Sequence, residues 1–389
     1  MHIPLAADTI DRSDIEALAD WVLAGKRLTK GPETAALELE FAQRMGTRHA
    51  VFVNSGSSAN LLMAAALKES GRLRNSVAVA PAVSWVTTVS PFLQLGFETH
   101  LCDADPMSLG LDVEHLRTLI ERYEPSVLIL VHVLGHPNRM DEIVELCEQN
   151  DIVLLEDACE ALGSIDEVGR NLGSIGLAGS FSLYYGHHLS TIEGGMVVTE
   201  DDEFHRLLVA LRSHGWSRDL EPSVQYALAQ NHGIDEFRNL YTFYHAGYNL
   251  RSTDLQAFIG RRQLQRLDVI SEARASIAAQ YREALLGFYH QSSAATLVSE
   301  FAFGTLVDDP PGTAERLRTA GVESRPLICG NIGRHPFWTN RFGTTPLAIA
   351  DQVHDHGMYL PIHASMSSEQ VSYVTDVFLS VAEPYELLL

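Results

Sequence analysis

The stretch AVFVNSGSSANLLMAAALK, residues 50–68, decides the fold class of this chain. Residues 50–53 are apolar and predict a short buried strand, and residues 58–68 carry apolar side chains at helical spacing. Small and polar residues join the two, as in a tight turn that leads from the end of a strand into a helix. A strand followed directly by a helix is the repeating unit of parallel α/β sheets. We therefore expect an α/β protein.

The same alternation of strand and helix continues to about residue 200. Apolar runs bounded by turn residues predict further strands at residues 77–80, 99–102, 127–133, 152–155, 180–184 and 196–199. Helices are expected at residues 113–122, 139–149 and 203–212. This pattern indicates a large, mostly parallel sheet that is covered by helices.

The pattern changes after residue 254. Residues 254–286 predict one long amphipathic helix or a pair of helices, and a smaller unit follows with a strand at 301–306 and helices at 313–320 and 369–381. We expect two domains. An N-terminal arm and a large α/β domain would occupy residues 1–265, and a linking helix with a small C-terminal α+β domain would occupy residues 266–389.

The composition excludes several classes of partner. The 389 residues include 28 Lys plus Arg against 50 Asp plus Glu, which gives a formal net charge of −22. A surface of this sign repels polyanions, so neither nucleic acid nor an acidic membrane is an expected partner. Because no basic segment followed by an apolar one begins the chain, and no apolar run is long enough to span a bilayer, we expect a cytoplasmic protein.

Cysteine and lysine are both scarce. The cysteines are too far apart for a CxxC metal or redox site or for a disulfide framework, and we expect free thiols at Cys102, Cys147, Cys159 and Cys329. The only lysines are Lys26, Lys30 and Lys68. Lysine chemistry is therefore absent from the remaining four fifths of the chain.

Three polar segments follow predicted strands and are candidates for chemistry. The turn at residues 54–60 could bind a phosphate at a helix N-terminus, although a simple N-cap explains it equally well. In LLEDACE, residues 154–160, the carboxylate of Asp157 could either pair with a protonated ring nitrogen or cap a helix. The turn GHHLSTIEGG contains His187 and His188, whose imidazoles exchange protons near neutral pH. Two adjacent histidines without an acidic partner at helical spacing do not predict a metal site.

These segments, with others in the same order, resemble the fold-type I, pyridoxal-phosphate-dependent nucleotide-sugar aminotransferases of the DegT/StrS type. The matching motifs are LTKGP (28–32), NSGSSAN (54–60), PAVSW (81–85), CDAD (102–105), GHP (135–137), EDA (156–158), EGG (193–195), SHG (213–215) and GYNLR (247–251). The resemblance runs through nearly the whole chain. It implies the fold-type I architecture, a mostly parallel α/β domain with a smaller C-terminal α+β domain, and a homodimer with shared active sites.

The resemblance also implies where the phosphate of the cofactor lies. The cofactor would be pyridoxal 5′-phosphate (PLP) or its amine form, pyridoxamine 5′-phosphate (PMP). Its phosphate would rest on Gly56 and Ser57 with help from Ser182. Asn249 would reach the same phosphate from the neighbouring subunit.

Three further residues would hold the cofactor ring. By the same resemblance, Asp157 would pair with the pyridinium nitrogen. Trp85 would stack on one face of the ring, and Glu160, which stands where the family's aminotransferases usually carry Gln, would lie against the other face.

The chain departs from the family at the lysine that binds the cofactor covalently. Counted back without gaps from residues 193–195, that position is His187, and no lysine lies nearby. An imidazole forms no stable covalent link to the cofactor aldehyde, so the cofactor would be held noncovalently and PMP would be a natural resting state. A subset of the family shares this exchange and a similar histidine pair, namely the nucleotide 4-keto-6-deoxyhexose 3-dehydratases.

Membership of this subset would make the protein an enzyme that removes the C3 hydroxyl from a nucleotide-linked 4-keto-6-deoxyhexose. The expected substrate is GDP-4-keto-6-deoxymannose, the amino donor is L-glutamate, and the product is a 4-keto-3,6-dideoxy sugar. His187 would act as base and acid, or His188 would do so if the turn is shifted by one residue. The dispersed cysteines favour the type that lacks an iron–sulfur cluster.

The sequence leaves other interpretations of the function open. The chain could be an aminotransferase that has lost its lysine, or a PLP-binding paralogue without catalysis. The nucleotide could be GDP, dTDP or CDP, and the pathway of the product is not indicated. Thr29 and Lys30 are candidate substrate contacts near the N-terminus, together with His188.

Overall fold

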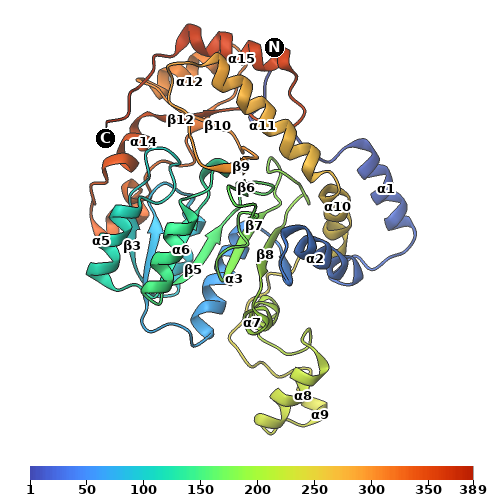
Figure 1. Ribbon diagram of the computed structural model, residues 1–389. Coiled ribbons are helices and arrows are strands. Elements are labelled where there is room, and N and C mark those ends of the chain that lie inside the picture. The colour runs from blue at the N-terminus through green and yellow to red at the C-terminus, as the bar shows by residue number, and fades with distance from the viewer. Residues whose placement is uncertain (389) are drawn as a thin grey trace.

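The apolar runs form a seven-stranded central sheet in the computed structural model, which describes residues 1–388 (Figure 1). The spatial order is β1-β8-β7-β5-β4-β2-β3. The pairs among β7, β5, β4, β2 and β3 are parallel, and β8 is antiparallel to both of its neighbours, β1 and β7. The strands are β1 (His49–Val53), β2 (Val77–Pro81), β3 (Glu98–Cys102), β4 (Val127–Val131), β5 (Val153–Asp157), β7 (Ala178–Ser182) and β8 (Gly195–Thr199).

Helices precede, connect and follow these strands. In chain order they are α1 (Arg12–Leu23), α2 (Pro32–Met45), α3 (Gly56–Glu69), α4 (Val86–Gln94), α5 (Val113–Tyr123), the 3-10 turn η1 (Val133–Gly135), α6 (Met140–Gln149), α7 (Asp202–Arg212), α8 (Pro222–Asn231), α9 (Glu236–Asn239) and α10 (Asp254–Leu264).

Apolar side chains on both faces of the sheet hold these helices. Successive residues of a strand point to opposite faces, so each face has its own apolar layer. On one face Leu128 and Leu154 pack in the cluster that includes α5 and α6. On the other face Ile129 and Leu155 pack in the cluster that includes α3 and α7. The central strands are therefore buried on both faces, and only their ends are free to carry polar side chains.

A smaller unit follows α10 and has a sheet of its own. Its antiparallel strands have the order β10-β12-β11, and α11, α12 and α15 share an apolar core with β10 and β12. The domain division expected at residues 265/266 stays a prediction. The elements are α11 (Leu267–Ala284), β10 (Phe303–Leu306), α12 (Pro310–Thr319), β11 (Arg325–Pro326), η2 (Ile332–Arg334), α13 (Pro336–Phe342), α14 (Ala348–His356), β12 (Gly357–Leu360) and α15 (Ser368–Val381). The short strands β6 (Ile165–Asp166) and β9 (Ala295–Leu297) pair with each other.

The structure confirms the α/β fold and most predicted elements. The strand expected at residues 127–133 stops at Val131, because the chain turns into η1 with Leu134 at a φ of 52°. Residues 254–286 form the pair α10 and α11 rather than one helix. The helix α4 was not predicted, since Pro91 lies inside it and four of its nine residues are β-branched.

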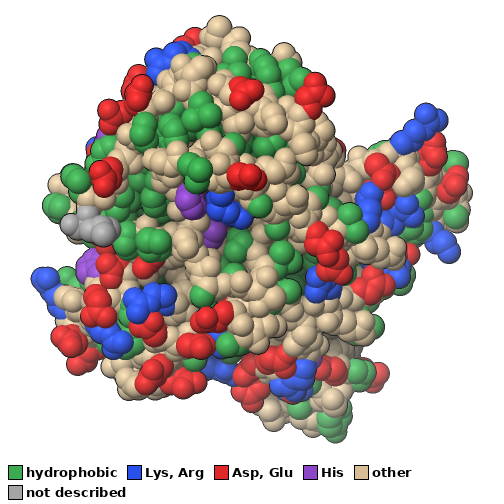
Figure 2. Space-filling model, turned by 45° about the horizontal axis from the view of Figure 1, so that its top comes forward, with side chains coloured by type: hydrophobic (Ala, Val, Ile, Leu, Met, Phe, Trp, Pro, Cys, Tyr) green, Lys and Arg blue, Asp and Glu red, His purple; other side chains and the backbone are tan. Residues whose placement is uncertain are grey.

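Two surface features complete the description. Figure 2 shows acidic and basic side chains interspersed over one face of the molecule. In Figure 1, α8 and α9 project from the body, away from the small sheet. None of the helices within residues 1–388 combines the length and the apolar character needed to cross a bilayer.

A buried guanidinium joins the small unit to the large one. Arg274 on α11 is 1% exposed, and its Nη1 donates to the carbonyl oxygens of Glu300, Phe301 and Ile362 at 3.1, 3.1 and 2.9 Å. Its Nη2 lies 3.5 Å from the carbonyl oxygen of His187. Because carbonyl dipoles from several segments solvate the charge, these segments are held in one arrangement.

Replacement of this guanidinium is the first test of the structure. We expect Arg274→Met to lower the free energy of unfolding by about 3 kcal/mol, because buried carbonyls lose their donor. The matched control is Arg117→Met on α5, where the exposed pair with Glu114 at 3.5 Å contributes less than about 0.5 kcal/mol. Urea unfolding of both variants measures the difference. Equal stability of the two variants would contradict the structural role of Arg274.

Candidate active site

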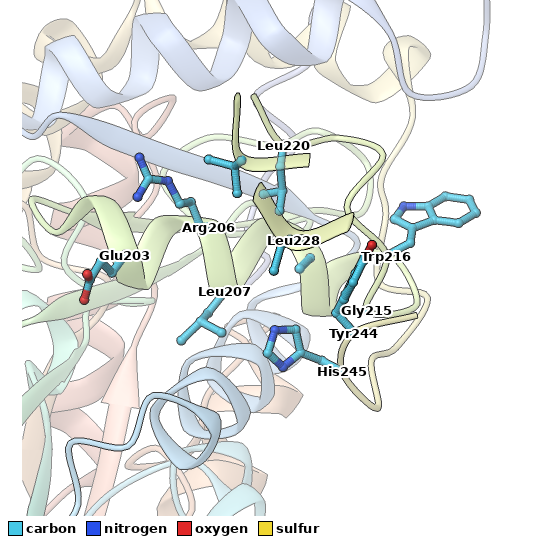
Figure 3. Close-up of a pocket in the computed structure, with 11 residues that line it drawn as sticks. Glu203, Arg206, Leu207, Gly215, Trp216, Leu220, Leu228, Tyr244 and His245 are labelled. Atoms are coloured by element: carbon cyan, nitrogen blue, oxygen red, sulfur yellow. The ribbon is translucent and has the colours of Figure 1, made fainter. Parts of the chain in front are cut away.

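The carboxyl ends of the central strands border a cavity of about 570 Å³. Residues from both sheets and from the N-terminal arm line it, so the cavity lies where the large and small units meet. Open α/β sheets bind ligands at this edge, and the volume is that of a small-molecule site. A second cavity of about 180 Å³ lies between α7 and α8 (Figure 3), and leucines supply much of its wall. The larger cavity alone collects polar groups from the motifs, and we take it as the candidate active site.

One corner of the cavity is built to receive a phosphate. Gly56 is the first residue of α3, and Ser55 caps the helix by accepting the N–H of Ser58 at 3.0 Å. The N–H groups of Gly56 and Ser57 have no carbonyl partner within the helix, as at every helix N-terminus. A Cβ on Gly56 would lie 2.7 Å from the Cβ of Ser182, so only glycine lets β7 approach this closely. The turn is therefore a capped helix, and its free N–H groups, here called the anion cradle, suit a phosphate. Phosphate binding at this place stays a prediction.

A buried carboxylate lies deeper in the cavity. Asp157 ends β5, and its Oδ2 accepts the amide of Asn60 and the hydroxyl of Thr88, each at 2.7 Å. Its Oδ1 accepts the N–H of Cys159 at 3.1 Å. Three donors hold the carboxylate in one orientation while it still lines the cavity. A ring nitrogen that meets this carboxylate would be kept protonated.

Two side chains border the space above Asp157. Trp85 precedes α4, lines the cavity and is 47% exposed, so a face of its ring can stack on a flat group. Glu160 also lines the cavity and accepts the N–H of Leu134 at 3.0 Å. Burial raises the pKa of Glu160 to about 7, against the opposing effects of that hydrogen bond and of the positive charge of Arg325. The carboxyl group therefore changes charge near neutral pH.

His187 presents an unprotonated nitrogen to the cavity. Its Nδ1 lies 2.8 Å from the carbonyl oxygen of Cys159, and because a carbonyl only accepts, Nδ1 carries the proton and Nε2 is left as the acceptor. Burial lowers the pKa of His187 to about 4; the Cys159 hydrogen bond opposes this shift and the charge of Arg274 adds to it. The imidazole is therefore neutral at pH 7. Gly186 places it, since a φ of 87° and a Cβ contact of 2.8 Å with Ala6 both require glycine.

The glycine pair after this turn has a steric cause. A Cβ on Gly195 would lie 2.2 Å from the carbonyl oxygen of Ser55, and one on Gly194 would lie 2.1 Å from the hydroxyl of Thr191. The start of β8 thus passes directly beside the phosphate corner. The EGG motif serves to bring the His187 turn and the anion cradle together.

Four predicted residues lie outside this cavity. His188 is fully buried, its Nε2 lies 2.7 Å from the carbonyl oxygen of Ser299, and it does not line the cavity; its substrate contact stays a prediction that this position does not favour. The Nζ of Lys30 pairs with Asp219 at 3.3 Å, and Thr29 bridges to Thr253 in the backbone; neither lines the cavity of its own chain. Asn249 is exposed, and its role at a neighbouring subunit's phosphate stays a prediction.

The donor set fits PLP. The cradle at α3 suits a phosphate, Asp157 suits a protonated pyridine nitrogen, and Trp85 suits the face of an aromatic ring. No lysine lines the cavity, so the residues present would hold the group without a covalent bond. Among residues 1–388 no cluster of three or more His, Cys, Asp or Glu side chains could hold a metal ion.

Comparison with known proteins agrees with this geometry. The profile of the DegT/DnrJ/EryC1/StrS aminotransferase family matches residues 9–379. The chain belongs to this family. A GDP-4-keto-6-deoxy-D-mannose 3-dehydratase of Yersinia pseudotuberculosis is 32% identical over 97% of this chain and 98% of its own length.

Two other known proteins are also similar to this chain. A dTDP-4-dehydro-2,6-dideoxy-D-glucose 3-dehydratase of Saccharopolyspora spinosa is 30% identical over 96% of this chain and 84% of its own length. The crystal structure of a GDP-4-keto-6-deoxymannose 3-dehydratase with a trapped PLP–glutamate geminal diamine has a TM-score of 0.88 and 31% identity, and covers 97% of this chain and 100% of that chain.

Several residues of the cavity were not found from the sequence. Thr88 lies in the unpredicted helix α4, and Arg325 and Tyr359 come from the small sheet, more than a hundred residues after the last recognised motif of the cavity. Nothing in the local pattern around these residues marks them as part of a binding site. Among these cavity residues, Asn60 alone could have been found from the sequence, because it ends the small-residue turn at residues 54–60.

The raised pKa of Glu160 gives a test of the site without any ligand. Between pH 4.5 and 7 the folded state keeps the proton that the unfolded state has lost, so the stability contribution of this group falls as pH rises through that window. We expect Glu160→Gln to be more stable than the parent protein by about 1–2 kcal/mol at pH 8, with little difference at pH 4.5. Chemical denaturation at both pH values measures this. Glu142→Gln on the surface is the control, and a gain independent of pH would contradict the assignment.

Proposed function

We propose that this enzyme removes the C3 hydroxyl group from a nucleotide-linked 4-keto-6-deoxyhexose, with PLP and PMP as cofactor forms and L-glutamate as amino donor. The observation that carries the proposal is the neutral imidazole of His187, which faces the cavity where the family pattern has its cofactor-binding lysine. Full-length relatives named as 3-dehydratases of GDP- and dTDP-linked sugars support it. We propose GDP-4-keto-6-deoxymannose as substrate, since two of these relatives are named for it.

The cofactor, when bound, supplies an amino group that condenses with the C4 ketone and a ring that accepts electrons from the bonds next to it. The protein holds the ring and moves the protons. Asp157 keeps the ring nitrogen protonated, which strengthens the electron-accepting character of the ring. The N-terminus of α3 binds the phosphate.

His187 provides the base and then the acid. Its free Nε2 accepts a proton from the carbon that bears the amino group of the cofactor. The protonated imidazole then donates that proton to the departing C3 oxygen of the sugar. A protonated imidazole with a pKa of about 4 is a stronger acid than an ordinary one, so burial favours the second transfer. A lysine amine on a flexible chain could return the proton to the sugar C4 and complete an amino transfer. The imidazole is fixed by the Cys159 carbonyl, and we propose that elimination follows for this reason.

Mass spectrometry of the sugar product tests the reaction. With PLP, L-glutamate and GDP-4-keto-6-deoxymannose, we expect a keto sugar that is lighter by one oxygen, together with ammonia and 2-oxoglutarate. His187→Ala should slow product formation by about 10²- to 10⁴-fold, because it removes the proton-transferring group. The control is His188→Asn, which changes the neighbouring imidazole outside the cavity and should retain dehydration. An amino sugar as the product, or undiminished dehydration by His187→Lys, would overturn the proposal.

The active site is proposed to be completed in a homodimer. Residues 222–239, here called the helical lobe, carry exposed aromatic side chains, with Phe237 89% and Tyr226 67% exposed. Aromatic side chains are enriched in protein–protein interfaces, which fits a contact of this lobe with a second subunit. Asn249 is exposed on the segment that returns from the lobe, which supports its predicted reach into a neighbouring subunit.

A mixing experiment tests the shared site. His187→Ala lacks the proton-transferring group, and in Asn249→Asp a negative charge would repel the phosphate. If Asn249 acts in trans, a hybrid dimer of the two variants contains one site with both native residues, and activity should reappear after subunit exchange. Two preparations of the same variant that are mixed in the same way serve as control. Hybrid dimers without regained activity would show that Asn249 does not act across the interface.

A further inference from the structure

Residues 135–137, the GHP motif, do not line the cavity, but they lie next to its wall. The motif continues the turn η1, in which the N–H of Leu134 donates to the carboxylate of Glu160 at 3.0 Å. The carbonyl oxygen of Leu134 accepts the N–H of Phe301 at 2.9 Å. Glu160 and Phe301 both line the cavity. The turn therefore joins a wall from the large unit to a wall from the small one.

The backbone of residues 299–301 is held on two sides. The carbonyl oxygen of the first residue lies 2.7 Å from Nε2 of His188, and those of the other two accept Nη1 of Arg274 at 3.1 Å each. On the opposite side, a Cβ on Gly135 would lie 2.7 Å from the first of these oxygens, so the glycine of the motif is required there. The GHP motif and the core thus enclose this segment between them.

The side chain of Glu300 is a buried acid outside the cavity. It is 2% exposed, its Oε1 accepts an N–H of Arg282 from α11, and the same oxygen lies 3.7 Å from Nε2 of His136 in the motif. Burial raises the pKa of Glu300 to about 7, against the opposing charge and hydrogen bond of Arg282. Because both charge states of the carboxyl group can accept from Arg282, the contact persists across neutral pH.

The next residue, Phe301, packs against the proposed base. Its ring centroid lies 4.9 Å from that of His187, with 47° between the ring planes. Burial is the largest cause that lowers the pKa of His187 to about 4. The charges of Arg274 and Arg325 add to this shift, whereas that of Asp157 opposes it. An apolar ring on the imidazole excludes water from it, so the place of Phe301 affects the protonation of His187.

We propose that Glu300 is a positioning residue for His187. Held by Arg282 and His136, it fixes residues 299–301 and thereby keeps Phe301 against the imidazole. Without these contacts the Phe301 ring would move away, water would reach the imidazole, and a larger share of it would be protonated at pH 5. The consequence for the reaction rests on the proposed function, in which the neutral imidazole is the base.

The titration of His187 tests the positioning without turnover. Diethyl pyrocarbonate acylates neutral imidazoles, and fragment mass spectrometry that separates residue 187 from residue 188 gives the rate at each pH. We expect Glu300→Met, which offers Arg282 no acceptor, to raise the pKa of His187 from about 4 to between about 5 and 6. Glu300→Gln keeps an acceptor and should stay near the parent value. The control is Glu315→Met, which removes an exposed pair with Arg318 at 2.6 Å.

Steady-state kinetics measures the consequence for the reaction. Because more of the base is protonated, Glu300→Met should lower kcat for dehydration about fourfold at pH 5 and less than about twofold at pH 8. The KM for the nucleotide sugar should change by less than about twofold, since no contact to the sugar is altered. Phe301→Ala should move the acidic limb in the same direction. Adding Glu300→Met to Phe301→Ala should have less than about a twofold further effect, because both act through one ring.

An unchanged His187 titration in folded Glu300→Met, as judged by circular dichroism, would overturn the proposal. Additive effects of Glu300→Met and Phe301→Ala would also overturn it, since Glu300 would then not act through Phe301. If Glu300→Met does not fold, Arg282→Met gives the same test with a smaller upward shift, because the Arg282 side chain is 34% exposed. Failure of the parent protein to dehydrate the sugar would refute the proposed function, while the titration would still decide the role of Glu300.

Discussion

The site depends on the way β5 ends, with two adjacent carboxylates that point to opposite faces of the sheet. Glu156 is fully buried and accepts the N–H groups of Gly173, Ile175 and Gly176 at 2.9, 2.6 and 2.6 Å. His132 completes the set at 3.0 Å. A buried carboxylate is tolerated only when it is fully hydrogen-bonded, so Glu156 fixes the loop that leads into β7 and the residue after β4 relative to β5. Asp157, one residue later, must then face the cavity.

A second constraint comes from the other side of the cavity. The turn with His187 is bound to the large domain through the Cys159 carbonyl and contacts the small one through Arg274. The first contact sets which ring nitrogen carries the proton. The second lets a buried positive charge act on the ring, which together with burial keeps the imidazole neutral. The protonation state of the His187 imidazole is thus a consequence of how the two units pack, and a local sequence motif does not indicate it.

The sequence predicted the large domain well because its signals are local. Apolar runs, the small-residue turn at 54–60 and the EDA motif each lie within one strand–turn–helix unit, and such units place their own residues at the same sheet edge. The likeness to the family then favoured His187 and left His188 as the alternative if the turn is shifted by one residue. The structure separates them, since a single residue step in the turn takes His188 into the core.

The contributions of the small unit could not be predicted in the same way. Arg325 and Tyr359 reach the cavity because β11 and β12 pair in one register and because the unit packs over the large sheet. The sequence around Arg325 and Tyr359 indicates neither the register of these strands nor the packing of the small unit. The same holds for Thr88, since α4 contradicts local helix preferences and forms through tertiary packing of Val89 and Phe92. Long-range contacts, which a local pattern does not reveal, thus complete a site whose frame the motifs had already indicated.

The loss of the lysine changes what the remaining contacts must do. A covalent bond would fix the cofactor at one atom whatever the strength of the other contacts. In the site proposed here the cofactor has no such bond, and its position would depend on the α3 N-terminus, Asp157 and Trp85 together. These contacts are rigid: the cradle admits no Cβ at Gly56, and Asp157 has three donors. Rigid noncovalent binding lets the amine form stay in the same place as the aldehyde form, because neither must break a bond to the protein. A cavity organised in this way suits a cycle that enters the sugar reaction as the amine.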